Sequence, residues 1–185
     1  MSNAITDARQ VKIVFSGPVG SGKTTSLYTI SDDKPVGTEV QSNEDIGKST
    51  TTVAMDYGTL QLESGVKIHL YATPGQERFS YMWDILGKGS AGVVLLVDQS
   101  RPSPLAELKF FLGEFRKIVK DAPIVIGLTK MDLAKETHLD KIYKYLEDEG
   151  LEYPVFELDT RDKAKVKEIV LSLMFLIQPD LMKAG

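Results

Sequence analysis

Apolar residues along the chain alternate between short continuous runs and stretches with helical spacing. The segments 91–97 and 123–128 are apolar runs typical of buried strands, and the segment 11–15, which includes Lys12, is also predicted to be a strand. Apolar residues recur every three or four positions over 105–119 and 166–177, which is the pattern of an amphipathic helix. This alternation predicts an α/β sandwich with a mostly parallel sheet.

One pair of predicted strands departs from the alternation. Residues 52–63 and 66–71 are rich in β-forming residues and are separated by Ser64-Gly65, which is a hairpin signal. One strand of this pair must run antiparallel in the sheet. With a last strand at 153–158, we expect six strands, one of them antiparallel, and about five helices. The polar segment 31–49 is expected to be a long functional loop.

Composition narrows the class of protein. The length of 185 residues fits one domain, predicted at 11–180 after a disordered lead at 1–10. The net charge of −4, with both signs mixed along the chain, argues against nucleic acid as the main partner. Having no cysteine excludes disulfides and thiol chemistry. The sequence shows neither an apolar run of transmembrane length nor a signal-peptide centre, so we expect a cytoplasmic protein.

A glycine-rich run follows the first predicted strand and fits the phosphate-binding pattern Gly-x-x-x-x-Gly-Lys-Ser/Thr. Gly17 and Gly22 allow a tight turn that points backbone N–H groups at phosphate oxygens. Lys23 places a charge near the β and γ phosphates, and Thr24 offers a hydroxyl to Mg²⁺. A helix is expected to follow, with its positive end toward the phosphates. The predicted phosphate contacts are Gly17, Val19, Gly20, Ser21, Gly22, Lys23, Thr24 and Thr25.

Two further motifs follow predicted strands. Gly75 can offer its N–H to a γ-phosphate because no side chain blocks the approach, and Gln76 can orient a water for in-line attack. Thr129-Lys130-Met131-Asp132 follows a buried strand. The Asp132 carboxylate can accept from the N1–H and exocyclic amine of guanine, a donor pair that adenine lacks. The aliphatic stem of Lys130 can pack along the base.

In this order, the motifs resemble those of the Ras-like small GTPases over roughly 11–177. The resemblance implies a P-loop three-layer sandwich, the Ras-like G domain, that binds GTP or GDP with Mg²⁺. The segment 52–57 looks like the first switch of the Rab branch, which places Thr52 at the Mg²⁺-binding threonine; Thr50 and Thr51 are register alternatives. Asp159-Thr160-Arg161 stands where the family has its last base-contacting loop, so Thr160 and Arg161 are candidate base contacts.

The run His69-Leu70-Tyr71, followed by Pro-Gly-Gln, looks most like bacterial relatives of the gliding-motility GTPase type. Such relatives often work with small dimeric regulators of the roadblock class, so a partner of that class, activating or exchanging, is expected. Residue 2 is Ser and the chain ends without Cys, which excludes myristoyl and prenyl groups. Any recruitment to a membrane is therefore expected to go through a partner.

Three residues depart from the family pattern. Ala72 stands where the family usually has an Asp that supports Mg²⁺ through water, although the gliding-motility branch also tends to lack it. Val19 stands where many relatives have Gly, and its branched side chain is expected to crowd Gln76 and any arginine that a partner inserts. Thr129 replaces the common Asn.

The resemblance implies a GTP/GDP switch with slow hydrolysis. Lys23 and Gln76 are its catalytic residues, and Thr24 and Thr52 its metal ligands. A nucleotide-bound scaffold with negligible turnover is the first alternative, favoured by Ala72 and Val19. A P-loop kinase is a weaker alternative, because the sequence shows no Arg-rich lid and the motif at 129–132 fits guanine.

Overall fold

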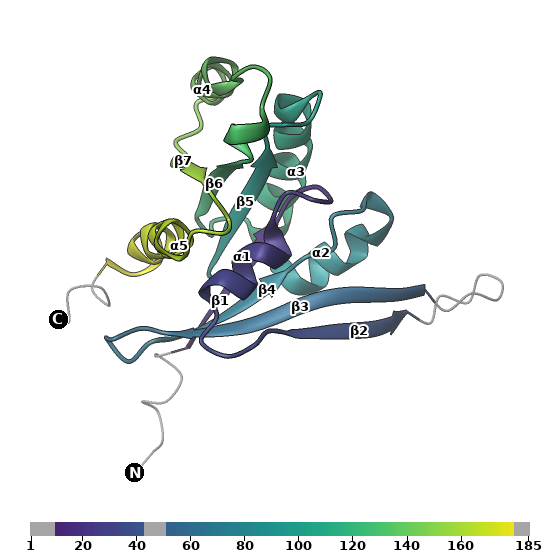
Figure 1. Ribbon diagram of the computed structural model, residues 1–185, viewed down its shortest axis with the longest axis vertical. Coiled ribbons are helices and arrows are strands. Elements are labelled where there is room, and N and C mark those ends of the chain that lie inside the picture. The colour runs from purple at the N-terminus through teal and green to yellow at the C-terminus, as the bar shows by residue number, and fades with distance from the viewer. Residues whose placement is uncertain (1–9, 43–50, 180–185) are drawn as a thin grey trace, which may run out of the picture.

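The computed structural model describes residues 10–42 and 51–179 and consists of one twisted sheet with helices on both faces (Figure 1). Seven strands lie in the order β2-β3-β4-β1-β5-β6-β7. The pairs β1–β4, β1–β5, β5–β6 and β6–β7 are parallel, whereas β3 runs antiparallel to both β2 and β4. The strands are β1 (Gln10–Ser16), β2 (Val36–Ser42), β3 (Thr51–Gln61), β4 (Lys67–Ala72), β5 (Gly92–Asp98), β6 (Ile124–Thr129) and β7 (Val155–Leu158).

Two apolar cores hold the layers together, one on each face of the sheet. Neighbouring strand residues such as Ile13 and Val14 point to opposite faces, so each joins a different core. The helices α1 (Lys23–Ile30) and α5 (Lys163–Ile177) cover the first face. The second face is covered by α2 (Ser80–Gly87), α3 (Pro104–Val119) and α4 (Leu139–Asp148). Two short 3-10 helices are η2 (Glu77–Phe79) and η3 (Met131–Leu133).

The predicted fold class is confirmed: the structure is a three-layer α/β sandwich with five α-helices among the described residues and one strand antiparallel to its neighbours. Every residue of β5 and β6 is buried, as their continuous apolar runs predict. Because β1, β5 and β6 are parallel, their carboxyl ends meet at one edge of the sheet, where Ser16, Asp98 and Thr129 lie.

The predicted strand number was wrong by one, because part of the segment expected to be a loop forms β2. The reason is the outer edge of β3. β4 pairs with one side of β3, and without β2 the other side would be the open edge of the sheet; β2 pairs there, from Val36 to Ser42 against Thr51 to Tyr57. Residues 31–35 connect α1 to β2 without regular structure, as the loop prediction expects, whereas 43–49 lie outside the described residues, as does the predicted lead segment except for Gln10, which belongs to β1. No helix in the described part of the chain is long and apolar enough to cross a membrane.

Candidate nucleotide-binding site

The glycine-rich loop leaves β1 in a conformation that requires glycine. Gly17 has φ +136, and a Cβ at this position would lie 2.3 Å from the carbonyl oxygen of Leu96 in β5. Gly22 has φ +101, and a Cβ there would lie 2.6 Å from Cγ2 of Thr160. Gly22 is also the N-cap of α1 and has no side chain to cap it. The N–H groups of the first turn of α1 are therefore available to an anionic ligand.

Lys23 is held beneath this loop. Its Nζ donates hydrogen bonds to the carbonyl oxygens of Gly17 and Pro18, each at 2.7 Å, and the residue is 7% exposed. Burial lowers the pKa of Lys23 to about 8, and the nearby carboxylate of Asp56 partly offsets this effect. A desolvated ammonium group held by backbone carbonyl oxygens is suited to binding an anion such as a phosphate.

Asp56 is a site residue that the sequence reasoning missed. The Thr24 hydroxyl donates to Oδ2 of Asp56 at 2.5 Å. In the β3–β4 ladder, Asp56 is directly opposite Ala72, the position where the family motif usually has its aspartate. The neighbouring strand therefore carries a carboxylate to the place where β4 has none. The hairpin turn held a signal for this pairing, since Asp56 and Ala72 are equidistant from Ser64 in the sequence.

The ends of β5 and β6 connect the loop to the opposite side of the site. The Thr129 hydroxyl donates to the carbonyl of Ser21 at 2.9 Å, so this threonine braces the phosphate loop directly. Lys130 has φ 56, and its Nζ pairs with Oδ2 of Asp98 at 2.7 Å. Burial alone would raise the pKa of Asp98, but hydrogen bonds from Lys130 and Ser100 outweigh it and hold that pKa below its ordinary value.

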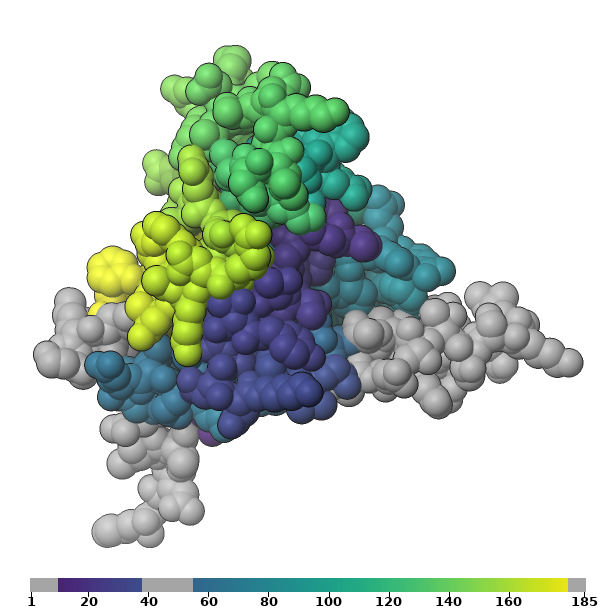
Figure 2. Space-filling view, in the orientation of Figure 1, coloured from purple at the N-terminus to yellow at the C-terminus, as the bar shows by residue number. Residues whose placement is uncertain are grey.

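The site has three walls. The phosphate loop forms the first, the segments that follow β5 and β6 form the second, and the loop between β7 and α5 forms the third. The Thr29 hydroxyl of α1 donates to the carbonyl of Thr160 at 2.7 Å. Arg161 forms a double hydrogen bond with Asp159 through Nε and Nη2, at 2.8 and 2.9 Å, which lowers the pKa of Asp159 to about 2. Nη2 of Arg161 also lies 3.7 Å from Oδ2 of Asp132. In Figure 2, the purple N-terminal segment touches the green and yellow-green segments that carry these residues.

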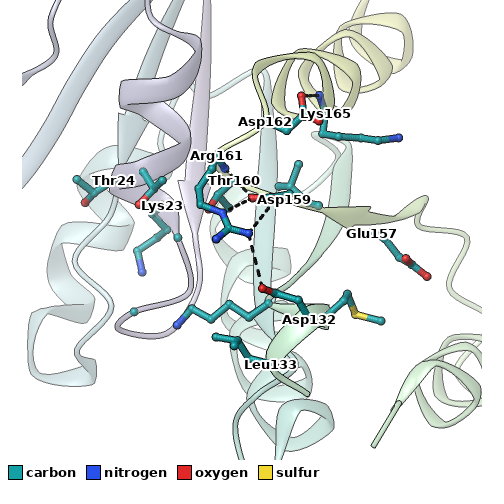
Figure 3. Close-up of a pocket in the computed structure, with 16 residues that line it drawn as sticks. Lys23, Thr24, Asp132, Leu133, Glu157, Asp159, Thr160, Arg161, Asp162 and Lys165 are labelled. Atoms are coloured by element: carbon teal, nitrogen blue, oxygen red, sulfur yellow. Dashed lines mark hydrogen bonds and ion pairs between the residues drawn. The ribbon is translucent and has the colours of Figure 1, made fainter. Parts of the chain in front are cut away.

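These three walls enclose a cavity of about 800 Å³, a volume in the range of small-molecule sites (Figure 3). Figure 3 shows Arg161 between the first helix and Asp132, while Glu157 points away from them. The predicted residues that line the cavity are Gly20, Gly22, Lys23, Thr24, Thr25, Lys130, Asp132, Thr160 and Arg161. Met131 and Asp159, which belong to the two predicted base-contacting motifs, also line it, and the lining residues outside every predicted motif are Leu133, Glu157, Leu158, Asp162 and Lys165.

The remaining predicted residues lie at or beyond the phosphate end. Gly75 packs on the loop so closely that a Cβ there would be 2.4 Å from the backbone nitrogen of Val19 and 2.9 Å from Nζ of Lys23. Gln76 is exposed, and its Oε1 accepts a hydrogen bond from Nε of Arg78 at 2.6 Å. Thr52 pairs with Gln41 in the β2–β3 ladder, but its side chain is outside the described part of the structure. Its metal-binding role stays a prediction.

Comparison with known proteins shows which family this chain belongs to. It belongs to the family described as "conserved hypothetical ATP binding protein", whose model matches residues 36–179. That match begins after the phosphate loop, so it rests on the rest of the domain.

The chain's distant relatives are small GTPases of the Ras, Rab and Arf families. It is 27% identical to human ADP-ribosylation factor-like protein 4C over 148 residues, which are 79% of this chain and 73% of the relative. It is 26% identical to Ras-related protein Rab-1D of Dictyostelium discoideum over 165 residues, covering 88% and 76% of the two chains. It is 25% identical to GTP-binding nuclear protein GSP1 of Encephalitozoon cuniculi over 176 residues, covering 92% and 78%.

Proposed function

We propose that this protein is a GTP/GDP-binding switch that hydrolyses GTP slowly and depends on a protein partner for a faster rate. The observation that carries the proposal is the shared cavity. The phosphate loop with Lys23 forms one end, and Asp132 with Lys130 forms the other. The relatives named above support the same role, since they are small GTPases and GSP1 is named as a GTP-binding protein.

Base selection falls to Asp132. It is exposed in η3, just after β6, and its carboxylate can accept two hydrogen bonds from the N1–H and exocyclic amine of guanine. Arg161 now lies near that carboxylate, but an exposed ion pair at 3.7 Å is worth little, so a base can displace it at small cost. The stem of Lys130, anchored by Asp98, offers an apolar surface along the base.

The phosphate end binds by charge and backbone N–H groups. Lys23 Nζ donates to two carbonyl oxygens and, over a long 3.5 Å, to Oγ of Ser21, and this third bond can be exchanged for one to a phosphate oxygen. The Thr24 hydroxyl and the Asp56 carboxylate fit Mg²⁺, which prefers hard oxygen ligands and is usually held by one or two carboxylates together with phosphates. When bound, Mg²⁺ would neutralise charge on the β and γ phosphates.

Slow hydrolysis follows from the state of Gln76. To orient a water, Gln76 must accept a hydrogen bond from that water through Oε1. In this structure Nε of Arg78 donates to one lone pair of that oxygen, so the Gln76 side chain is tied to its neighbour and must reorient before its other lone pair can face a water at the phosphate. Val19 is 51% exposed beside the place where Gln76 would act. A partner that moves Arg78 or supplies its own charge would raise the rate, and a roadblock-type regulator is our candidate for that partner.

A nucleotide panel tests base selection. We expect calorimetry to show binding of GTP and GDP and none of ATP, and Asp132→Asn to shift preference to xanthine nucleotides because the acceptor becomes partly a donor. Glu157→Gln is the matched control, since it changes a carboxylate that lines the same cavity but points away. Tight ATP binding would favour the adenine specificity in the family's description, and unchanged GTP affinity in Asp132→Asn would remove Asp132 from the base site.

The scaffold alternative makes a different prediction for turnover. It gains support from Ala72 and Val19, since neither helps catalysis. Single-turnover hydrolysis of bound GTP separates the two functions. If the natural protein hydrolyses GTP slowly but measurably and Gln76→Leu hydrolyses it more slowly still, the switch is supported. If the natural protein and Gln76→Leu have the same rate, the scaffold is supported.

A further inference from the structure

A buried tryptophan is hydrogen bonded to the backbone beside Gly75. Nε1–H of Trp83 in α2 donates to the carbonyl oxygen of Pro74 at 2.7 Å, and Trp83 is only 1% exposed. Its ring packs against Phe110, Phe111 and Phe115 of α3, with centroids 6.0, 5.0 and 6.0 Å away. The indole is therefore fixed in place by the core, and the carbonyl it binds is fixed with it.

Because the Pro74 carbonyl is held in one direction, the N–H of Gly75, which belongs to the same peptide group, is also held in one direction. The described residues contain no cis peptide bond, so this peptide is trans. In a trans peptide the carbonyl oxygen and the following N–H point in opposite directions. Since the oxygen points to Trp83, the N–H of Gly75 points away from α2. Gly75 itself borders the loop, within contact of Val19 and Lys23.

We propose that Trp83 is a positioning residue that orients the Pro74–Gly75 peptide so that the Gly75 N–H can donate to the γ-phosphate of GTP. This inference rests on the function proposed above and assigns a residue to its discrimination between GTP and GDP. GDP has no γ-phosphate, so the orientation of this peptide affects only the triphosphate. Trp83 never touches the nucleotide and acts through the backbone.

The competing explanation is that Trp83 only fills the core between α2 and α3. A residue with that role alone changes thermal stability when replaced, and it affects both nucleotides equally. The two explanations therefore differ in one quantity, the ratio of the affinities for a GTP analogue and for GDP.

The experiment measures that ratio in the full chain. Affinities for GDP and for a non-hydrolysable GTP analogue are determined for the natural protein, for Trp83→Phe, and for protein with 3-benzothienylalanine at position 83. The last replacement keeps the shape of the ring but puts sulfur in place of N–H. In both altered proteins we expect the affinity for the GTP analogue to fall about three- to tenfold, which is the usual effect of losing one neutral hydrogen bond. The affinity for GDP should stay within about twofold of that of the natural protein.

Phe111→Leu is the matched control. Phe111 packs on the same tryptophan ring at 5.0 Å and makes no bond to Pro74. We expect this variant to lose thermal stability, as large-to-small core substitutions do, and to keep the affinity ratio of the natural protein.

The outcomes separate the two proposals. If the natural protein binds neither guanine nucleotide, the proposed function fails, and the role of Trp83 fails with it. If it binds both and the benzothienyl protein keeps the natural ratio, only the positioning role is overturned. The isosteric replacement decides this even if Trp83→Phe does not fold.

Discussion

Asp56 and Ala72 lie directly opposite each other in the β3–β4 ladder, and the carboxylate of Asp56 reaches the hydroxyl of Thr24. A carboxylate that the family usually carries on one strand is thus found on the next strand, pointing to the same threonine. The metal-binding role proposed for this carboxylate can be carried from either position because paired residues of neighbouring strands have their Cβ atoms only about 5 Å apart.

This pairing predicts the metal dependence of the site. Asp56→Ala should weaken the effect of Mg²⁺ on nucleotide dissociation about 10- to 100-fold, the usual result of losing a carboxylate near a metal. The double variant Asp56→Ala/Ala72→Asp should recover much of the loss. Dissociation of a fluorescent GDP, followed as Mg²⁺ is titrated, measures both. Full Mg²⁺ dependence in Asp56→Ala would show that another group provides this contact.

Nucleotide binding should take up protons at mildly alkaline pH. Burial puts the pKa of Lys23 at about 8 in the nucleotide-free protein, so half of the molecules carry a neutral Lys23 at that pH. Phosphates favour the charged form and raise this pKa, so binding at pH 8 should take up about half a proton, and affinity should fall as pH rises from 8 toward 10. Calorimetry in buffers of different ionisation enthalpy measures the uptake, and Lys23→Arg should abolish it.

The same group affects folding stability with a definite sign. The folded-state pKa of Lys23 lies below the ordinary value of 10.5, so the folded protein releases this proton first as pH rises. Between about 8 and 10.5 the unfolded chain binds more protons, and the contribution of Lys23 to stability therefore increases with pH over that window. Urea unfolding of the nucleotide-free protein and of Lys23→Arg, compared at pH 7.5 and 9.5, isolates this contribution. A contribution that decreases with pH would contradict the burial of a charged Lys23.

Lys23 and Gln76 should divide binding and turnover between them. Lys23→Ala removes a charge-assisted contact present with either nucleotide, so affinity for GDP and GTP should fall about 10- to 100-fold. Gln76→Leu should leave affinity nearly intact and slow hydrolysis about a hundredfold. Glu77→Gln, a change at the neighbouring exposed residue, is the control for both measurements. Equal losses of GTP affinity in Lys23→Ala and Gln76→Leu would disprove the division.

Val19 should limit hydrolysis by its bulk. Val19→Gly should raise the single-turnover rate while GTP affinity stays within about twofold, and Val19→Ala should give an intermediate rate. A partner that supplies or repositions a charge can add a further factor of about 10³–10⁵. Fast multiple turnover by the purified chain, unchanged in Val19→Gly, would mean that the site needs neither the space nor a partner.

Much of the fold could be predicted because its signals are local. Apolar runs mark β5 and β6, helical spacing marks α3 and α5, and Ser64-Gly65 marks the turn between β3 and β4. The strand β2 could not be found this way. Its segment lies within a predominantly polar stretch, and it becomes a strand because β3 presents an outer edge, on the side away from β4, to pair with; that edge is a property of the sheet rather than of the segment.

The site residues likewise divide into those with a local sequence signal and those whose role depends on the fold. The phosphate loop and Asp132 carry their chemistry in contiguous motifs, and the structure places both at one cavity. Asp56 belongs to no contiguous motif, and its role emerges only from the register of β3 against β4. Trp83 could be recognised in the sequence as a large apolar residue near Gly75, but its bond to Pro74 depends on how α2 packs on α3.

The bracing of the pocket has a consequence for how the protein is made. The bond from Thr129 to Ser21 joins residues 108 positions apart, and the bond from Thr29 to Thr160 joins residues 131 positions apart. A ribosome delivers the phosphate loop early and the loop at 159–162 late, at about 5–20 residues per second. The nascent chain therefore spends seconds with a phosphate loop that has no opposite wall, and it gains a complete nucleotide pocket only after the segment before α5 has emerged.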